Sequence, residues 1–278
     1  MPSIEHKNLR DVPLVVLDTE TTGLHPGLGH RIIEVGAIRY ENWKPVAQIN
    51  QLLQPDWPMH PGASKIVGIT DQDLVGQPRF PAIADELLAL VDGAIIVAHN
   101  AAFDSEFIAL ELALAGKATG VKEPVLPNPW ICTLKLARSQ FYFGRNGLKH
   151  IATKLRIPVG RTHRAINDVY ITTKILKRMS QELAKRNFKT VGDYFDAQGN
   201  AIYTPIPPNV ELMPPMDVAL AEKRDLEILY INEAKTVRRI TPRYTMHHRG
   251  TPYLAAYCHL RQEPRVFRID RIFSATLL

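Results

Sequence analysis

The feature that most constrains this chain is a short apolar run that leads directly into two carboxylates. Residues 14–17 read Leu-Val-Val-Leu, which is typical of a buried strand, and Asp18-Thr19-Glu20 follow without a break. Because side chains alternate along a strand, Asp18 and Glu20 project to the same side. Neighbouring carboxylates repel each other unless a cation lies between them, and Mg²⁺ prefers such oxygen ligands. A pair of solvated acids at a strand end is the alternative for this motif taken alone.

Two further segments place acids at the ends of predicted elements. In AIIVAHNAAFD, a second buried strand ends at Ala98, and the helix that follows has Asp104 in its first turn. The helix dipole alone also favours an acid at that position. In THRAIND, His163 lies on a loop before a predicted helix, and Asp168 lies within the first turns of that helix. A loop histidine suits a general base and a helix-anchored carboxylate suits a metal ligand, although a lone loop histidine is more often a surface residue.

The order of the elements predicts an α/β domain followed by a small β domain. Strand-like runs come first, at residues 14–17, 32–40 and 46–53. Strands then alternate with helical spacing, which fits an α/β fold. Prolines cluster after this region and predict a semi-rigid linker, and four closely spaced β-like segments follow, which predict a small barrel or curled sheet. We therefore expect domains at residues 12–188 and 222–278, joined by a linker at 189–221.

Composition excludes several classes of protein. Hydrophobic residues make up 45% of the 278 residues, which is typical of a globular chain rather than a disordered one. No apolar run reaches the roughly 18 residues of a membrane span, and the N-terminus predicts no signal peptide. Two cysteines give no disulfide framework, so we expect a cytoplasmic location. From residue 222 onward, 11 Lys or Arg stand against 6 Asp or Glu, which indicates either a polyanionic partner or a basic solvated surface.

Taken together, the three acidic motifs resemble the DEDDh exonuclease family, which includes the epsilon proofreading subunit of bacterial DNA polymerase III. Asp18 and Glu20 match the first family motif, Asp104 the second, and His163 with Asp168 the third, including its His-x4-Asp spacing. The resemblance covers roughly the first two-thirds of the chain. It implies a ribonuclease H-like fold, in which helices flank a mixed central sheet.

The resemblance also implies a mechanism with two Mg²⁺ or Mn²⁺ ions per active site, since such a pair stabilises the entering and leaving oxygens of a phosphodiester. Asp18 would bridge both ions, Glu20 and Asp168 would ligate the first, and Asp104 would ligate or orient the second. His163 would accept the proton of the attacking water, a role that its ordinary pKa of about 6.5 suits. The last nucleotide of the substrate would contact Thr21, Gly23, Leu24 and Ile69.

The C-terminal segments resemble a WYL domain, a small Sm- or SH3-like β-barrel. The matching text is RRITP, YLAAYCHLR and FRIDRI. Alternation along the second of these segments predicts one buried face, formed by Leu254, Ala256, Cys258 and Leu260. Aromatic side chains beside arginines can stack on bases and hold phosphates. The candidate nucleic-acid contacts are Tyr253, Tyr257, Arg261, Arg265, Arg268 and Arg271. The alternative is that Tyr253 and Tyr257 pack under the linker and that neighbours such as Arg268 and Asp270 form surface ion pairs.

We therefore expect a metal-dependent exonuclease that degrades DNA from the 3′ end, with single strands preferred and the C-terminal domain binding nucleic acid. Two alternatives stay open. The same nuclease could act on RNA 3′ ends, or the WYL domain could bind a nucleotide that gates the nuclease. A role in replication or repair would require a separate DNA polymerase or repair partner.

Overall fold

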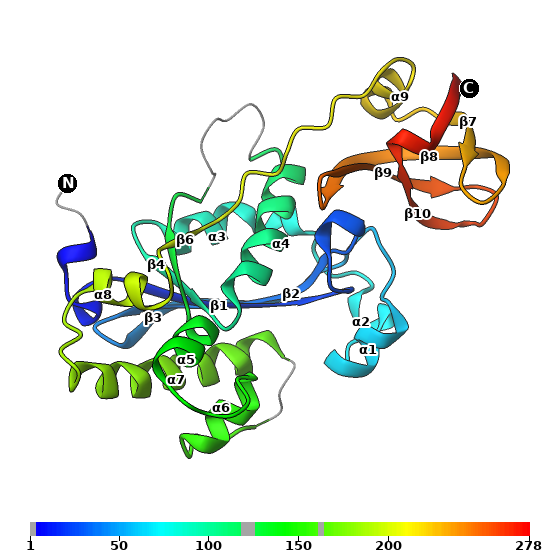
Figure 1. Cartoon of the computed structure of the whole chain (residues 1–278). Helices are drawn as coiled ribbons and strands as arrows, with labels where there is room; N and C mark the ends of the chain where they lie inside the picture. The colour runs from blue at the N-terminus through cyan, green and yellow to red at the C-terminus, as the bar shows by residue number, and fades with distance from the viewer. Residues whose placement is uncertain (1–3, 118–125, 161–163) are drawn as a thin grey trace. The chain divides into compact units, whose positions relative to one another are not determined.

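The computed structural model describes residues 4–117, 126–160 and 164–278 (Figure 1). The chain forms two compact units. The first contains the described residues up to Thr21, Ile32–Pro55 and the described part of Met59–Ile206. The second contains Thr22–Arg31, Asp56–Pro58 and Pro207–Leu278. The second unit therefore combines the C-terminal β segments with two short segments from earlier in the chain.

Among the described residues, a six-stranded sheet forms the centre of the first unit, in the order β3-β2-β1-β4-β5-β6. Its strands are β1 (Leu14–Thr21), β2 (Ile32–Glu41), β3 (Lys44–Leu52), β4 (Ile95–Ala98), β5 (Pro129–Cys132) and β6 (Ile202–Tyr203). The pairs β1–β4 and β4–β5 are parallel, whereas β1–β2, β2–β3 and β5–β6 are antiparallel. The sheet is mixed, which confirms the expectation from the sequence.

Helices cover both faces of this sheet (Figure 1). The described α-helices of the first unit are α1 (Pro61–Val67), α2 (Asp71–Leu74), α3 (Ala84–Val91), α4 (Ala101–Leu114), α5 (Thr133–Gln140), α6 (Leu148–Lys154), α7 (Ala165–Ala184) and α8 (Val191–Ala197). One apolar cluster joins the sheet to α3 and α4, and another joins its opposite face to α5, α6, α7 and α8. This layering accounts for the continuous apolar run in β1, because a strand that is covered on both sides needs no polar face.

The face of β1 that α7 covers is the one that leads to the carboxylates. Alternate residues beginning with Leu14 belong to the cluster with α7, and those beginning with Val15 belong to the cluster with α3 and α4. Asp18 and Glu20 continue the alternation of Leu14. A side chain near the start of α7 can therefore reach them.

The second unit is built on a five-stranded antiparallel sheet, within the described residues, in the order β10-β9-β8-β7-β11. Its elements are α9 (Met216–Glu222), β7 (Leu226–Ile231), β8 (Lys235–His248), β9 (Thr251–Cys258), β10 (Glu263–Arg268) and β11 (Ile272–Leu277). Leu226, Ile240, Leu254 and Phe267 are buried in its core. Ala256 and Cys258 are buried there too, as expected, whereas Leu260 is exposed because β9 ends at Cys258 and a turn follows.

The expected closed β-barrel is wrong, because this sheet is open. Closure would require the edge strands β10 and β11 to pair, and the described strands show no such pairing. A 3₁₀ turn at Ile269–Arg271 follows β10, and β11 then pairs with β7 on the far edge. Short, closely spaced strands predict a small β module, but they do not determine which edge the last strand joins.

The described residues contain no membrane-spanning helix, since none of their helices combines the length and the hydropathy that a span requires.

Candidate metal centre

Three carboxylates from two elements meet beside the first sheet. Asp18 and Glu20 lie near the end of β1, and Asp168 lies in the first turn of α7. One carboxylate oxygen of each residue lies within 4.8 Å of one from both others. Glu20 and Asp168 are only 8% and 7% exposed, and Asp18 is partly buried. The structure thus brings together three of the acids that the sequence motifs singled out.

A close approach between β2 and α7 determines where Asp168 lies. Gly36 of β2 is the residue opposite Asp18 in the β1–β2 register. A Cβ atom at Gly36 would lie 2.5 Å from both the carbonyl carbon of Ala165 and the amide nitrogen of Ile166. Only glycine leaves room for this approach, so Gly36 allows the start of α7 to lie against the sheet beside the carboxylates.

A partly buried ion pair holds the start of α7 at the same place. Glu34 of β2 is fully buried and lies opposite Glu20 in the β1–β2 register. Arg164, which precedes α7, donates to Glu34 Oε1 from Nε at 3.0 Å and from Nη2 at 2.8 Å. The amide of Ala165 donates to Oε2 of the same carboxylate at 3.1 Å, so Glu34 also caps the helix. A glutamate inside the apolar run IIEVGAI was the sequence signal that could have revealed this pair.

Asp104 is held separately, by hydrogen bonds to β1. It lies in the first turn of α4 and is 2% exposed. Its Oδ1 accepts from the backbone nitrogen of Thr19 at 3.0 Å and from the Thr19 hydroxyl at 2.8 Å. The charge of Asp104 acts on Asp18 and Glu20, although Asp104 is not in the group of three whose oxygens lie within 4.8 Å.

Burial raises the pKa values of Asp18, Glu20 and Asp104, and repulsion by neighbouring carboxylates raises those of Asp18 and Glu20 further. Burial raises the pKa of Asp18 well above its ordinary value, and the charges of Asp104, Glu20 and Asp168 raise it further. Burial, followed by the charge of Asp168, raises the pKa of Glu20 to about 8. Burial raises the pKa of Asp104 to about 7, against the lowering effect of the hydrogen bonds from Thr19. A divalent cation would stabilise the ionised forms, and this all-oxygen donor set on rigid elements fits a hard ion such as Mg²⁺ or Mn²⁺.

The other predicted active-site residues lie in different places. Thr21 is buried at the end of β1. Gly23 and Leu24 belong to the second unit, in which Leu24 is 71% exposed. Ile69 is buried in a small apolar cluster with residues of α1 and α2. His163 lies outside the described residues, so its role as general base stays a prediction.

A histidine that the motifs did not single out ties three segments of the first unit together. His99 directly follows β4, and its Nδ1 lies 2.9 Å from the hydroxyl of Thr133, the first residue of α5. Its Nε2 lies 3.0 Å from the carbonyl oxygen of Asn146, just before α6. Burial lowers the pKa of His99 to about 4, so the ring is neutral at pH 7. The sequence signal that could have revealed His99 was its position in the run AHNAAFD.

The candidate contacts in the C-terminal sheet differ in how they are paired. Three of the four arginines bind nearby polar side chains, in the pairs Arg265–Glu263, Arg268–Asp270 and Arg271–Asn232. Arg261 lies in the exposed turn after β9, and its guanidinium has no side-chain partner among the described residues. The Arg243 guanidinium lies 6.0 Å from the centre of the Tyr257 ring. The surface ion pair considered as the alternative for Arg268 and Asp270 is therefore present, and Arg265 forms a similar pair with Glu263.

Comparison with known proteins assigns the first unit. The profile of the exonuclease family matches residues 15–176, which include Asp18, Glu20, Asp104 and Asp168. The chain belongs to the exonuclease family. It is a metal-dependent 3′→5′ exonuclease of the DEDDh type. The profile of the WYL domain matches residues 211–277, so this exonuclease carries a WYL domain at its C-terminal side.

Two curated relatives and one solved structure show how far the similarity extends. The DNA polymerase III subunit epsilon of Treponema pallidum is 35% identical over 179 residues, which cover 63% of this chain and 80% of that protein. The PolC-type DNA polymerase III of Thermotoga petrophila is 30% identical over 201 residues, which cover 72% of this chain but 14% of that protein. Exonuclease X in complex with 5′ overhanging duplex DNA is 28% identical, with a TM-score of 0.50 and coverage of 67% of this chain and 99% of that chain.

Proposed function

We propose that this exonuclease removes nucleotides from the 3′ ends of single-stranded DNA. The observation that carries the proposal is the group formed by Asp18, Glu20 and Asp168, whose oxygens lie within 4.8 Å of one another. DNA is favoured because one relative is named as a subunit of a DNA polymerase and the structure of Exonuclease X contains DNA. A single strand is favoured because Glu20 and Asp168 are more than nine-tenths buried, so a terminal nucleotide would have to leave a duplex to reach them.

The proposed site holds two divalent ions, Mg²⁺ or Mn²⁺. Asp18 would bridge them, Glu20 and Asp168 would hold the first, and Asp104 would hold or orient the second. When bound, the ions would stabilise the negative charge that develops on the entering and leaving oxygens. The raised pKa values of Glu20 and Asp104 support this proposal, because buried acids whose ionised forms are disfavoured gain most from a nearby cation.

Other side chains of the protein would orient these ligands and move the proton. The Glu34 carboxylate accepts hydrogen bonds from Arg164 and from the backbone of Ala165 at the start of α7. These bonds would keep Asp168 directed towards β1. Thr19 would orient Asp104 through two hydrogen bonds to one carboxylate oxygen. We propose His163, five residues before Asp168 in the sequence, as the group that accepts the proton of the attacking water. The proposed contacts with the last nucleotide are Thr21, Gly23, Leu24 and Ile69.

A digestion time course with end-labelled oligonucleotides tests this function. We expect a 5′-labelled single strand to give a ladder that shortens from the 3′ end, and a 3′-labelled strand to release its label at once as a mononucleotide. DNA, RNA and duplex substrates of one sequence, each with Mg²⁺, Mn²⁺ or chelator, establish the preference. The Asp18→Asn variant serves as the inactive control. Shortening from the 5′ end, or faster digestion of RNA than of DNA, would contradict the proposal.

We extend the proposal to the C-terminal sheet, which would bind the substrate strand through Tyr253, Tyr257 and Arg261. Arg261 is the strongest candidate because its guanidinium has no side-chain partner among the described residues. Arg265 and Arg268 form ion pairs with neighbouring acids, which reduces their ability to bind a phosphate.

We also propose a DNA polymerase as the protein partner, because the Treponema pallidum relative is named as a subunit of DNA polymerase III. Co-expression of the tagged chain with the polymerase subunits of its own organism, followed by gel filtration, tests this. Elution of the chain in one peak with a polymerase subunit supports the partnership, and separate elution at micromolar concentrations contradicts it.

A further inference from the structure

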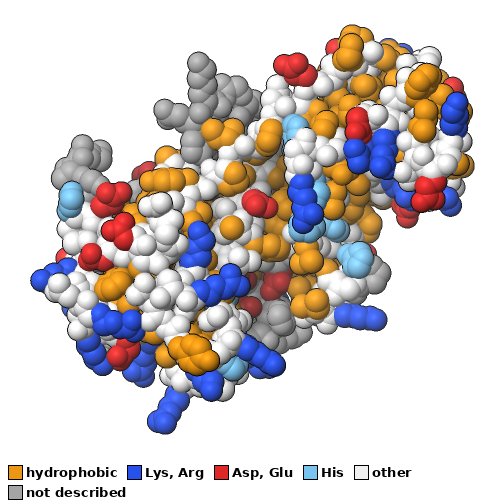
Figure 2. Space-filling view, viewed as in Figure 1, with side chains coloured by type: hydrophobic (Ala, Val, Ile, Leu, Met, Phe, Trp, Pro, Cys, Tyr) orange, Lys and Arg blue, Asp and Glu red, His pale blue; other side chains and the backbone are white. Residues whose placement is uncertain are grey.

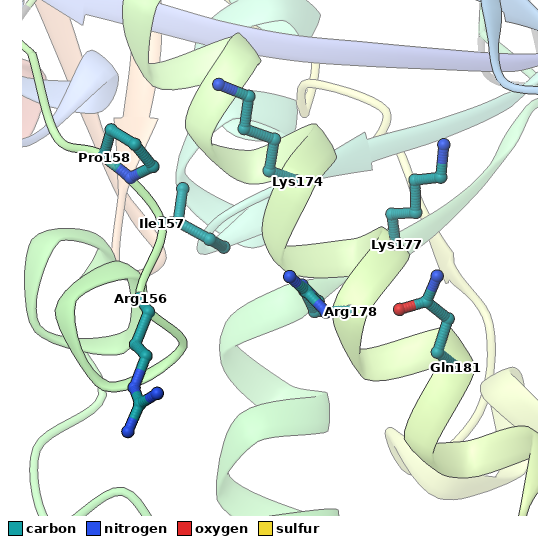
Figure 3. Close-up of a pocket in the computed structure, with 7 residues that line it drawn as sticks. All are labelled: Arg156, Ile157, Pro158, Lys174, Lys177, Arg178 and Gln181. Atoms are coloured by element: carbon teal, nitrogen blue, oxygen red, sulfur yellow. The ribbon is translucent and has the colours of Figure 1, made fainter.

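The outer face of α7 forms a basic pocket that the metal centre does not use (Figure 3). Its cavity measures about 410 Å³, which is within the range of pockets that bind small ligands. Four of its lining residues are cations: Arg156, Lys174, Lys177 and Arg178. The rest of the lining is neutral and comprises Ile157, Pro158 and Gln181. The pocket therefore combines positive charge with one amide and a small apolar wall.

These cations form no direct ion pair with a described carboxylate, although the charge of Arg178 acts on Glu182. None of the four makes an ion pair with a described acid, and all of them are exposed. The nearby acid on α7, Glu182, is already bound to Lys185 at 2.8 Å, which is the main cause of its lowered pKa. Figure 2 shows Lys and Arg side chains gathered over the region of α6 and α7. Because like charges repel, an anion in the pocket would relieve the repulsion among the four.

The spacing of these residues fits a row of phosphates better than one anion. Lys174, Lys177, Arg178 and Gln181 recur at intervals of three and four residues, so they share one face of α7. Figure 3 shows them along the helix, with Arg156, Ile157 and Pro158 on the segment beside it. Seven residues of helix extend about 10 Å at 1.5 Å per residue. Successive phosphates of one strand rise about 3.4 Å along a duplex, so this length corresponds to about three phosphate steps.

We infer that this pocket binds backbone phosphates of the nucleic-acid strand whose 3′ end the carboxylates process. The inference rests on the proposed function, and it adds a second point of attachment on the element that carries Asp168. Lys174 follows Asp168 by six residues, which is about 9 Å along α7. A strand of several nucleotides would therefore gain affinity from the pocket, whereas a dinucleotide would not. A free mononucleotide offers the same chemical group and is the other possible source of phosphate.

Binding of single-stranded DNA to the triple variant Lys174→Gln/Lys177→Gln/Arg178→Gln tests the inference. The variant is made in the Asp18→Asn background, so that fluorescence anisotropy reports binding without hydrolysis. We expect about a tenfold loss of affinity for a long oligonucleotide at low salt, and a salt dependence whose logarithmic slope is smaller by about 2, since each phosphate contact contributes about 0.7. Binding of a mononucleotide should not change. The matched control, Lys7→Gln/Arg10→Gln/Lys44→Gln, removes equal charge at other exposed positions of the first unit and should change affinity by less than about twofold.

Three results would overturn the inference. They are an unchanged affinity and salt slope in the triple variant, an equal loss in the control, and a loss of mononucleotide binding with long-strand affinity intact. Cleavage of labelled 3′ ends by the wild-type protein is measured in parallel. If the triple variant loses affinity as expected but the wild-type protein cleaves no labelled 3′ ends, the proposed function alone is refuted. A wild-type protein that cleaves normally, beside a triple variant with unchanged binding, would refute the pocket alone.

Discussion

The acids of the candidate metal centre lie in surroundings that disfavour their ionised forms. Without a cation, burial and neighbouring carboxylates raise the pKa of Glu20 to about 8 and burial raises that of Asp104 to about 7. A bound ion would favour the ionised forms, so metal binding would release protons. The metal affinity of this site should therefore increase with pH across the neutral range.

We expect the metal-free protein to lose stability as the pH rises from 4.5 towards 8. Glu20 has its pKa raised from 4.5 to about 8, so in this window the folded state keeps a proton that the unfolded state has released. Each kcal/mol that is lost lowers the Tm by roughly 2–4 °C in a chain of this size. Thermal unfolding in chelator measures the trend, and Mg²⁺ should raise the Tm most at the alkaline end. If the Tm in chelator increases with pH over this range, the predicted direction of the pH dependence is wrong.

Glu34 lies outside the predicted motifs, yet its replacement should weaken the site. Glu34→Gln removes the charge that holds Arg164 and the start of α7, which should cost about 1–3 kcal/mol of folding free energy. Displacement of Asp168 should weaken Mn²⁺ binding by about 10–100-fold. Calorimetric titration with Mn²⁺ measures the effect. The control is Glu41→Gln on the same strand, which breaks an exposed pair with Arg39 and should leave Mn²⁺ affinity unchanged. Equal affinities in all three proteins would exclude the positioning role.

The helix α7 is the element on which the site depends most. It supplies Asp168, packs on β1 and β2, and begins where Gly36 allows close contact. Its opposite face carries the basic pocket. One helix thus connects the metal centre with the proposed binding site for the strand, so changes in its position should affect both.

Gly36→Ala should displace the start of α7 and impair the metal centre. The added methyl group would lie 2.5 Å from backbone atoms of Ala165 and Ile166, and such overpacking typically costs about 1–3 kcal/mol. We expect a lower Tm and a nuclease rate reduced at least about tenfold at saturating Mg²⁺. Gly147→Ala is the matched control, since a Cβ there meets nothing within 4 Å. A Gly36→Ala variant as active and as stable as the Gly147→Ala variant would refute the close-approach explanation.

Elements with strong local patterns were predictable, and those that depend on distant contacts were not. The apolar runs of β1 and β4 and the helices bearing Asp104 and Asp168 follow from periodicity alone. Within the stretch expected to be a linker, Val191–Ala197 and Ile202–Tyr203 instead form α8 and β6. Side-chain hydrogen bonds attach this stretch to β5: the Cys132 backbone N–H donates to Gln198 Oε1 at 2.7 Å, and Trp130 Nε1 donates to the Thr204 hydroxyl at 3.0 Å. No local pattern reveals such bonds, because their partners lie 66 and 74 residues apart.

The same distinction applies to the site. Asp18, Glu20, Asp104 and Asp168 could be singled out as candidate ligands because each lies at the end of a predicted element and together they match a family pattern. The importance of Glu34 comes from Arg164, which lies 130 residues further along the chain. Its role becomes visible only when both residues are placed in the fold.

In the whole molecule, the chain enters the second unit directly after β1. Thr22–Arg31 belongs to that unit, together with the C-terminal sheet. Within the unit, the Tyr244 hydroxyl donates to the carbonyl of Gly29 at 3.5 Å. Deletion of the C-terminal domain would therefore remove partners of a segment adjacent to a proposed metal ligand. Point substitutions on the sheet separate nucleic-acid binding from this structural effect.

Arg261→Gln should weaken binding of single-stranded DNA more than Arg265→Gln does. Arg261 is exposed and its guanidinium has no described side-chain partner, whereas Arg265 is paired with Glu263 at 2.8 Å. Loss of one phosphate contact should reduce the logarithmic salt slope by about 0.7. Anisotropy titrations at several salt concentrations, in the Asp18→Asn background, measure both variants. If Arg265→Gln causes the larger loss of affinity for single-stranded DNA, the proposal that Arg261 is the stronger phosphate contact is wrong.

Anomalous diffraction from crystals grown with Mn²⁺ tests most directly whether the carboxylates share divalent ions. We predict a Mn²⁺ peak about 2.1 Å from oxygens of Asp18, Glu20 and Asp168, a distance typical of a small divalent ion bound to oxygen, and its absence in the Asp18→Asn variant. A fully active enzyme whose Mn²⁺ binds elsewhere, with these three carboxylates unliganded, would contradict the proposed centre.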